Sequence, residues 1–224
     1  MKYYKVLGKG GVSCHGGNGQ WSLPIGDKPG LWMRKLDNIV PCQCGYHLCQ
    51  SGDLIHWLNE EIYEAEGKGE LERHNNNKDV FPQARLIRKF DNWNERTARL
   101  FAADCAEHVL HIFEKEYPKD DRPRKVIQSA RDFANGKISS TIMYEAMYAA
   151  EDAKRSAAWS AAWSAFWSAF WSAAWSATVE ITAWNAAMST AWAAVDATIE
   201  YSTMNDERKW QTERLFYYLQ EQLT

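Results

Sequence analysis

Four cysteines and two histidines near the start of the chain are the residue types in this sequence that could bind a metal. They are Cys14, His15, Cys42, Cys44, His47 and Cys49. Thiolates and imidazoles are the usual ligands of tetrahedral zinc, so the four cysteines Cys14, Cys42, Cys44 and Cys49 form a candidate zinc set. Their C-x-C and C-x4-C spacings differ from the usual C-x2-C knuckle. The alternative is that they are free thiols in a reducing cytosol.

A second pattern in the same region could bind a nucleotide cofactor. His15 lies in a glycine-rich loop after the first expected strand, and Tyr46 lies on a middle strand. A glutamate follows on a later strand, and the candidates are Glu64, Glu66 and Glu70. This order resembles the sites of ADP-ribosyltransferase-like enzymes. The resemblance implies that His15 and Tyr46 hold NAD while Glu66 stabilises the developing oxocarbenium. The alternative is that the histidines are hydrogen-bonded structural residues.

The elements that would position these residues change in kind near residue 91. All but one of the 13 glycines precede it, and neither glycine nor proline follows Gly136. We therefore expect an α+β fold, with a small N-terminal α+β domain in residues 1–90. Residues 91–224 are expected to form an all-α helical bundle that includes a Trp/Ala/Ser-rich helix.

In the N-terminal domain, alternating and β-branched runs predict short strands around one short helix. The expected strands are residues 3–7, 46–49, 62–66 and 84–90, with the helix ending near Leu58 and a polar loop at 74–79.

In the second domain, capping and proline signals predict where the helices begin and end. The first helix begins at Asn92 and ends after Tyr117, where Pro118 stops it. The second has Pro123 in its first turn and ends at Gly136, and the third begins at Ser139 or Ser140. Later breaks are expected near residues 178–182 and 202–206, which would give five or six helices. The first helix carries Asp104, Glu107, His108 and His111, for which we expect a solvated charged face.

A tryptophan repeat dominates the expected third helix. The repeat places one Trp at every fourth position: Trp159, Trp163, Trp167, Trp171 and Trp175. Each step of four residues advances about 40° beyond a full helical turn, so the five side chains form a wrapping ridge. A ridge of this size needs cover from other helices of the same chain, a second copy of the chain, a protein partner or lipid. We therefore predict that these tryptophans form a binding interface or a packed core.

The overall composition excludes some classes of partner. The formal net charge is -3, and no basic patch is interleaved with aromatic residues, so nucleic acid is not an expected partner. Residues 156–179 carry no charge, but alanine and serine insert weakly and the tryptophans are central, so no membrane span is expected. The N-terminal residues lack the apolar segment of a signal peptide, which predicts a cytoplasmic location.

The segment that begins NERTARLFAADCAEHVLHIFEKEYPKDDRPRKVIQSARDFANGKIS, with the later ERKWQTERL, resembles the helical domain of immunity proteins found in bacterial toxin systems and phages. The resemblance covers residues 92–219. It implies a non-enzymatic domain that binds and neutralises another protein and needs no cofactor. The N-terminal SCHGGNGQW and GYHLC resemble an uncharacterised phage-type domain, which implies no activity.

Three functions follow from these patterns. The first is a protein-binding immunity-like, phage accessory or anti-defence protein. The second is an NAD-using transferase in the N-terminal domain. The third is a structural protein in which the Trp repeat drives homo-oligomers.

Overall fold

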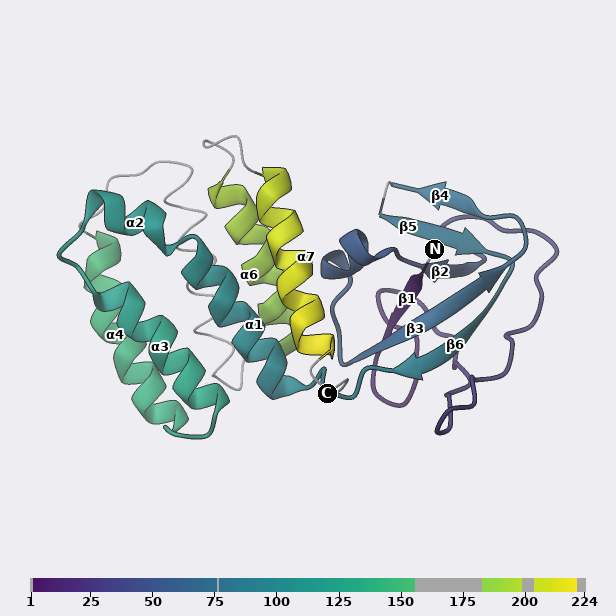
Figure 1. Cartoon of the computed structure of the whole chain (residues 1–224), viewed down its shortest axis with the longest axis horizontal. Helices are drawn as coiled ribbons and strands as arrows, with labels where there is room; N and C mark the ends of the chain where they lie inside the picture. The colour runs from purple at the N-terminus through teal and green to yellow at the C-terminus, as the bar shows by residue number, and fades with distance from the viewer. Residues whose placement is uncertain (1, 76, 156–182, 199–203, 221–224) are drawn as a thin grey trace. The chain divides into compact units, whose positions relative to one another are not determined.

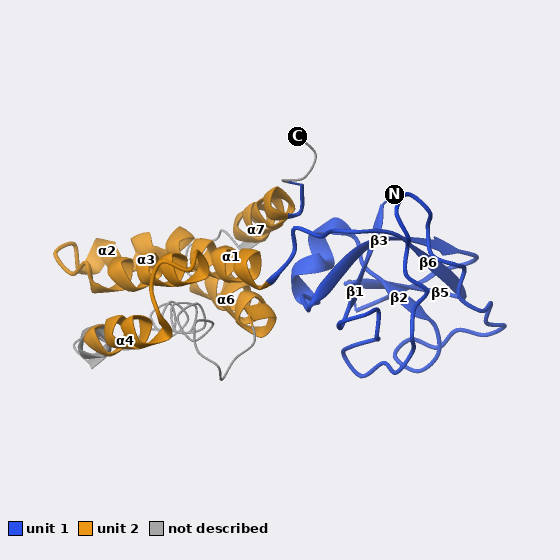
Figure 2. Ribbon diagram, turned by 90° about the horizontal axis from the view of Figure 1, so that it is seen from below, with its two compact units in different colours: residues 1–94, 219–224 blue, residues 95–218 orange. Residues whose placement is uncertain are grey.

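The structure is a computed structural model that describes residues 2–75, 77–155, 183–198 and 204–220. It divides into two compact units (Figure 2). One unit is made of residues 1–94 and 219–224, and the other of residues 95–218. The first contains the strands and the second contains α-helices (Figure 1), which confirms the expected α+β fold class.

The first unit contains an antiparallel three-stranded sheet in the order β1-β3-β6. Its strands are β1 (Tyr3–Leu7), β3 (Glu61–Lys68) and β6 (Gln83–Lys89). Tyr4 pairs with Glu64 across β1 and β3, and the register between β3 and β6 shifts at Glu64 and Ala65. All three strands coincide closely with the runs that the sequence predicts.

A second antiparallel sheet has the order β2-β5-β4. It consists of β2 (Tyr46–Leu48), β4 (Glu72–His74) and β5 (Lys78–Phe81), and the short helix η1 (Ser51–His56) follows β2. A bridge between Tyr4 and Cys49 connects the strand regions β1 and β2. The prediction of a polar loop over residues 74–79 is wrong at both ends, because His74 and Lys78 pair with each other in a hairpin. Their polar side chains conceal a strand pattern that depends on cross-strand pairing.

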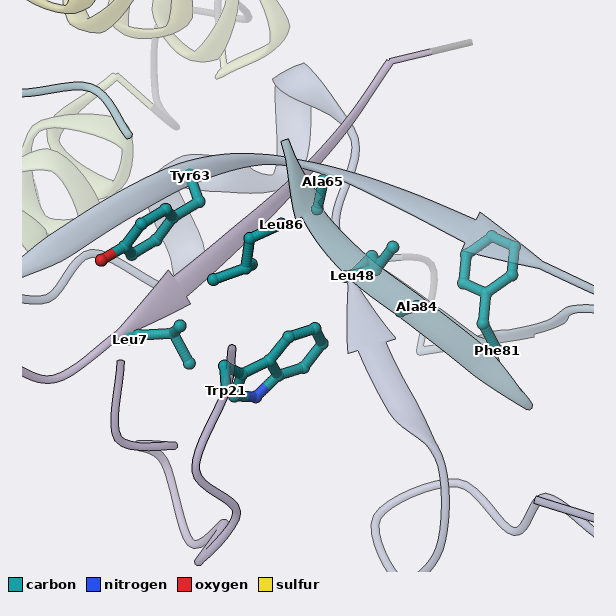
Figure 3. Packing of buried hydrophobic residues seen from close by; sticks show 8 residues of the cluster. All are labelled: Leu7, Trp21, Leu48, Tyr63, Ala65, Phe81, Ala84 and Leu86. Carbon is teal, nitrogen blue, oxygen red and sulfur yellow. The ribbon is translucent and has the colours of Figure 1, made fainter. Parts of the chain in front are cut away.

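The core of this unit gathers side chains from both sheets and from the loop that carries Trp21 (Figure 3). Its buried members are Leu7, Trp21, Leu48, Tyr63, Ala65, Phe81, Ala84 and Leu86. Gly67 of β3 lies directly against Phe81, since a Cβ added there would come within 2.5 Å of the ring. Glycine is therefore required for the close approach of β3 to this core.

The second unit contains six described helices. They are α1 (Glu95–His108), α2 (Leu110–Glu116), α3 (Arg122–Ala134), α4 (Ser140–Arg155), α6 (Ala183–Ala197) and α7 (Met204–Gln220). Helix α1 packs against α3 and α6, and α3 packs against α4. The single helix expected up to Pro118 is divided in two, because Val109 leaves the helical geometry between α1 and α2.

Helix α3 begins and ends, and helix α4 begins, near the proline, glycine and serine residues that the sequence predicts. Pro123 lies in the first turn of α3, where its missing N–H is not needed. Gly136 follows α3 with a φ of 68°, a left-handed conformation that glycine adopts without strain. The Ser139 hydroxyl accepts a hydrogen bond from the backbone N–H of Ile142 at 3.5 Å and caps α4.

Helix α6 shows how an alanine-rich and tryptophan-bearing segment packs in this protein. Its buried face is made of small residues, including Ala186, Ala187, Ala191 and Ala194, while Trp192 is 43% exposed. The small alanine side chains of α6 therefore form its packed face, and Trp192 is at the surface. The five tryptophans of the repeat lie outside the described residues. Among the helices that the structure describes, none is long and apolar enough to cross a membrane.

Candidate functional site

A cavity of about 600 Å³ in the first unit collects most of the candidate site residues that the sequence singled out in the N-terminal domain. Its wall includes all six candidate metal ligands and also Tyr46. The glycine-rich loop supplies His15, the residues around β2 supply Tyr46 and His47, and β1 supplies Lys5. The fold thus brings together residues that are more than 30 positions apart in the sequence.

The four cysteines of the candidate zinc set line this cavity without forming a cluster of metal ligands. All are free thiols. The Cys42 sulfur accepts a hydrogen bond from Nζ of Lys78 at 3.2 Å. The other three donate to separate backbone carbonyls: Cys14 to Val6, Cys44 to Asn38 and Cys49 to Tyr4. In the described part of the chain, no group of three or more His, Cys, Asp or Glu residues could hold a metal ion.

The two histidines of the cavity have defined hydrogen bonds that fix their roles. Nε2 of His15 donates to the carbonyl oxygen of Trp57 at 2.9 Å, since a carbonyl can only accept. Nε2 of His47 accepts from the backbone N–H of Cys42 at 3.0 Å. Burial and the positive charges of Lys5 and Lys78 lower the pKa of His47 to about 4, so its ring is neutral at pH 7. Both rings therefore form structural hydrogen bonds, which is the role that we considered as the alternative to catalysis.

The cavity assembles only part of the transferase pattern. His15 and Tyr46 both line it, and the Tyr46 hydroxyl donates to the carbonyl of Arg34 at 2.8 Å. Glu66 is outside the lining, and its carboxylate pairs with Arg85 at 2.7 Å. The described residues that line the cavity include no Asp or Glu. The described wall of the cavity therefore has no carboxylate that could stabilise an oxocarbenium ion.

Two lysines dominate the charge of the cavity instead. Nζ of Lys5 donates to the carbonyl of His47 at 3.0 Å and lies 5.2 Å from the Trp21 ring centroid. Nζ of Lys78 lies 5.0 Å from the ring of Trp57. Sequence reasoning missed both lysines. A signal was present for Lys5, because the period of a strand places it on the same face as Tyr3 and Leu7, which contact the core.

In the second unit, the acidic residues of α1 form a network that ties helices together. Asp104 is only 6% exposed. Its carboxylate accepts hydrogen bonds from Arg131 of α3 at 2.7 Å and from Arg214 of α7 at 2.6 Å. The Tyr218 hydroxyl donates to the same carboxylate at 2.5 Å. Burial and the charge of Asp104 raise the pKa of Tyr218, which keeps this hydroxyl a hydrogen-bond donor.

The same helix makes a second polar contact with α7. Nδ1 of His108 lies 2.6 Å from the carboxylate of Glu207, which is 3% exposed. The His108 ring stacks on Trp210 with a centroid distance of 3.7 Å and an interplanar angle of 6°. The prediction of a solvated charged face on α1 is therefore wrong for Asp104, which is buried and pairs with other helices. His108 is exposed as expected, although it also contacts α7. The missing information was the position of α7, which is about 100 residues later in the sequence.

Comparison with known proteins gives one family. No curated protein and no solved structure shows a significant match to the chain. Residues 88–217 match the sequence pattern of the family described as Imm-5 like putative immunity protein. This match spans the strand end at β6 and nearly all of the helical unit, and it covers more than half of the 224 residues. The chain therefore belongs to the Imm-5 like putative immunity protein family.

Proposed function

We propose that this chain is a non-enzymatic protein-binding protein whose helical unit binds and neutralises another protein. The family match supports an immunity-like role for residues 88–217. The chemistry of the helical unit agrees with binding, because Asp104 of α1 is engaged with arginine and tyrosine of neighbouring helices, and His108 of α1 is engaged with Glu207 of α7. Groups held in this way stabilise a rigid scaffold and are poorly placed to transfer protons to a substrate.

The observation that carries the proposal is the exposure of Trp192 on α6. This helix buries alanines against α1 and leaves Trp192 at the surface, with the guanidinium of Arg208 5.7 Å from its ring centroid. Tryptophan and arginine are the residue types that most often dominate binding energy at protein interfaces. The exposed ring of Trp192 is carried by helix α6 and contacts Arg208 of α7. A ring supported in this way is suited to insertion into a pocket of a partner protein.

The proposed interface also includes the tryptophan repeat. Trp159, Trp163, Trp167, Trp171 and Trp175 lie outside the described residues, so their place in the interface rests on the sequence alone. The packing of α6 supports this placement by analogy, since α6 contains the same mixture of alanine and tryptophan as the repeat and buries its alanines. We expect a protein partner to cover these rings, and a second copy of the chain is the competing occupant.

The proposal can be tested by growth and by direct binding. Bacteria that produce the full chain are made to express, one at a time, members of a panel of protein toxins. We expect the chain to restore growth with one toxin or a few related ones, and the purified pair to form a complex of fixed stoichiometry in native mass measurements. Restoration of growth without a complex would contradict neutralisation by binding.

Two variants sharpen this test. Trp192→Ala removes the exposed ring of α6 and should weaken the complex by about 30-fold, the effect of losing about 2 kcal/mol at a binding hot spot. Tyr148→Ala removes another exposed aromatic ring, on α4, and should leave the affinity unchanged. Equal effects of the two substitutions would argue against an interface centred on Trp192. If the unmodified chain instead associates with itself as its concentration rises, the homo-oligomer is the better account.

A further inference from the structure

The cavity of the first unit contains two lysines that have no carboxylate partner among the described residues. The hydrogen bond of Lys5 is to the carbonyl of His47, and that of Lys78 is to the sulfur of Cys42. Elsewhere in the same unit the pattern is different: Nζ of Lys89, for example, lies 2.7 Å from the carboxylate of Glu61. Two ammonium groups that line the same concave site, without a carboxylate in its described wall to balance them, are electrostatically unfavourable.

The other titratable groups of the wall do not compensate this positive charge at neutral pH. Burial raises the pKa of the Cys14 thiol and raises that of Cys49 to about 12, so both are neutral. The ring of His47 is also neutral, because its pKa is lowered to about 4. Burial, together with the charge of Lys78, lowers the pKa of Lys5. A bound anion would remove this penalty, and the cavity is therefore better matched to an anionic occupant than to water.

The ammonium groups are held in place by the surrounding side chains. Lys5 lies over Trp21, whose indole N–H donates to the Ser13 hydroxyl at 3.2 Å. Lys78 lies over Trp57, whose indole N–H donates to the carbonyl of Asn77 at 3.0 Å. Because each lysine rests on a tryptophan that is itself hydrogen-bonded, little side-chain entropy is left to lose when an anion binds.

The backbone around the cavity is also shaped for the close approach of a ligand. The glycines at positions 16, 17 and 19 line it and carry no side chain that would block access to the main chain. His15 and Cys42, which also line it, have φ values of 56° and 64°. Non-glycine residues in this left-handed region are strained, and such strain is concentrated at ligand sites.

The volume and the remaining wall indicate more than a bare inorganic ion. About 600 Å³ is within the range of small-molecule sites and exceeds what one phosphate group fills. Met33, Leu36 and Tyr46 add apolar surface to the wall, which an organic group can contact. Two lysines match the double negative charge of a phosphate ester better than the single charge of a carboxylate.

We propose that this cavity binds a small organic phosphate of about mononucleotide size, with its phosphate between Lys5 and Lys78 and its organic part against Met33, Leu36 and Tyr46. This site is in the first unit and outside the family match, so it is separate from the protein-binding role of the helical unit. It is a binding site, and no reaction is assigned to it.

The test is isothermal titration of the full chain with ADP, and in parallel with inorganic phosphate. We expect ADP to bind and inorganic phosphate to bind at least about tenfold more weakly, since it lacks the organic part. Lys78→Gln and Lys5→Met should each weaken ADP binding by tenfold or more. Lys28→Gln removes the same charge from an exposed loop position and should leave the affinity unchanged.

Three results would overturn the proposal. They are the absence of ADP binding, ADP affinities that do not change in Lys78→Gln, and inorganic phosphate binding as tightly as ADP. Lys5→Met alters a half-buried strand residue, so its fold is checked by circular dichroism, and Lys78→Gln decides the outcome if the Lys5 variant does not fold. Binding of a protein partner to the helical unit is measured separately, so a failure of either proposal is distinguishable from a failure of the other.

Discussion

The carboxylate of Asp104 accepts a hydrogen bond from the hydroxyl of Tyr218, 114 positions later in the chain, at a distance of 2.5 Å. This contact connects the first helix of the helical unit to its last. Arg131 and Arg214 approach the same carboxylate, so one buried acid holds α1, α3 and α7 together. The rigidity of the proposed binding scaffold depends on this acid.

Replacement of Asp104 by alanine should therefore destabilise the helical unit. The substitution leaves Arg214 and Tyr218 without their carboxylate partner, and loss of one member of a buried pair typically costs about 3 kcal/mol. Urea denaturation followed by helical circular dichroism measures the effect. Asp196→Ala removes the same charge from an exposed position on α6 and should change the free energy of unfolding by less than about 0.5 kcal/mol. Similar losses in the two variants would show that Asp104 is not a structural centre.

The first unit should lose stability when the pH falls from about 6.5 toward 4. The His47 ring has a pKa of about 4 in the folded chain and an ordinary value of 6.5, so the unfolded chain takes up a proton first as the pH decreases. The stabilisation is complete above pH 6.5 and is lost through this window, by on the order of 1–2 kcal/mol after allowance for solvent screening.

Denaturation of the full chain at several pH values, followed by a signal from the first unit, measures this loss. In His47→Gln the same window should be nearly flat, because glutamine does not titrate. A slope that is the same in the variant and in the unmodified chain would assign the pH dependence to other groups.

Gly67→Ala should destabilise the first unit by about 1–3 kcal/mol, because the new methyl group would meet the Phe81 ring at 2.5 Å. Gly52→Ala is the matched control, since a Cβ at position 52 has no atom within 4 Å. Thermal unfolding of both variants compares them directly. An equal melting temperature for the two would mean that β3 and Phe81 do not pack as closely as the structure has them.

The chain should not release nicotinamide from NAD, because Glu66 is paired with Arg85 and lies outside the cavity wall that contains His15 and Tyr46. The measurement is chromatographic detection of nicotinamide after incubation of the purified chain with NAD. Release that disappears in Glu66→Gln, with His15→Ala as a second variant, would restore the transferase hypothesis.

Local patterns in the sequence were enough to predict much of the fold. The strand at 3–7, the proline at the start of α3 and the glycine after it depend on neighbouring residues, and the structure confirms them. The hairpin of β4 and β5 was missed because its strands are short and polar residues flank its turn, and their pairing depends on contacts across the sheet.

The candidate sites were harder to predict, because they depend on distant contacts. His15, Tyr46 and the four cysteines share one cavity, but we missed the two lysines that determine its charge. The strand period was the sequence signal for Lys5, whereas Lys78 resembled an ordinary surface residue. Asp104 appeared solvated for a similar reason, since its partner Tyr218 could be identified only from the packing of α7 on α1. Charge partners that are far apart in sequence leave no local pattern.

The central claim is that the helical unit neutralises a protein partner through a surface that includes Trp192. The most direct measurement is the affinity of the full chain for a toxin whose effect on growth it suppresses, compared between the unmodified chain, Trp192→Ala and Tyr148→Ala. The account predicts a complex of fixed stoichiometry that Trp192→Ala weakens by about 30-fold and Tyr148→Ala leaves intact. An affinity that Trp192→Ala does not change, in a variant that retains its helical circular dichroism, would contradict it.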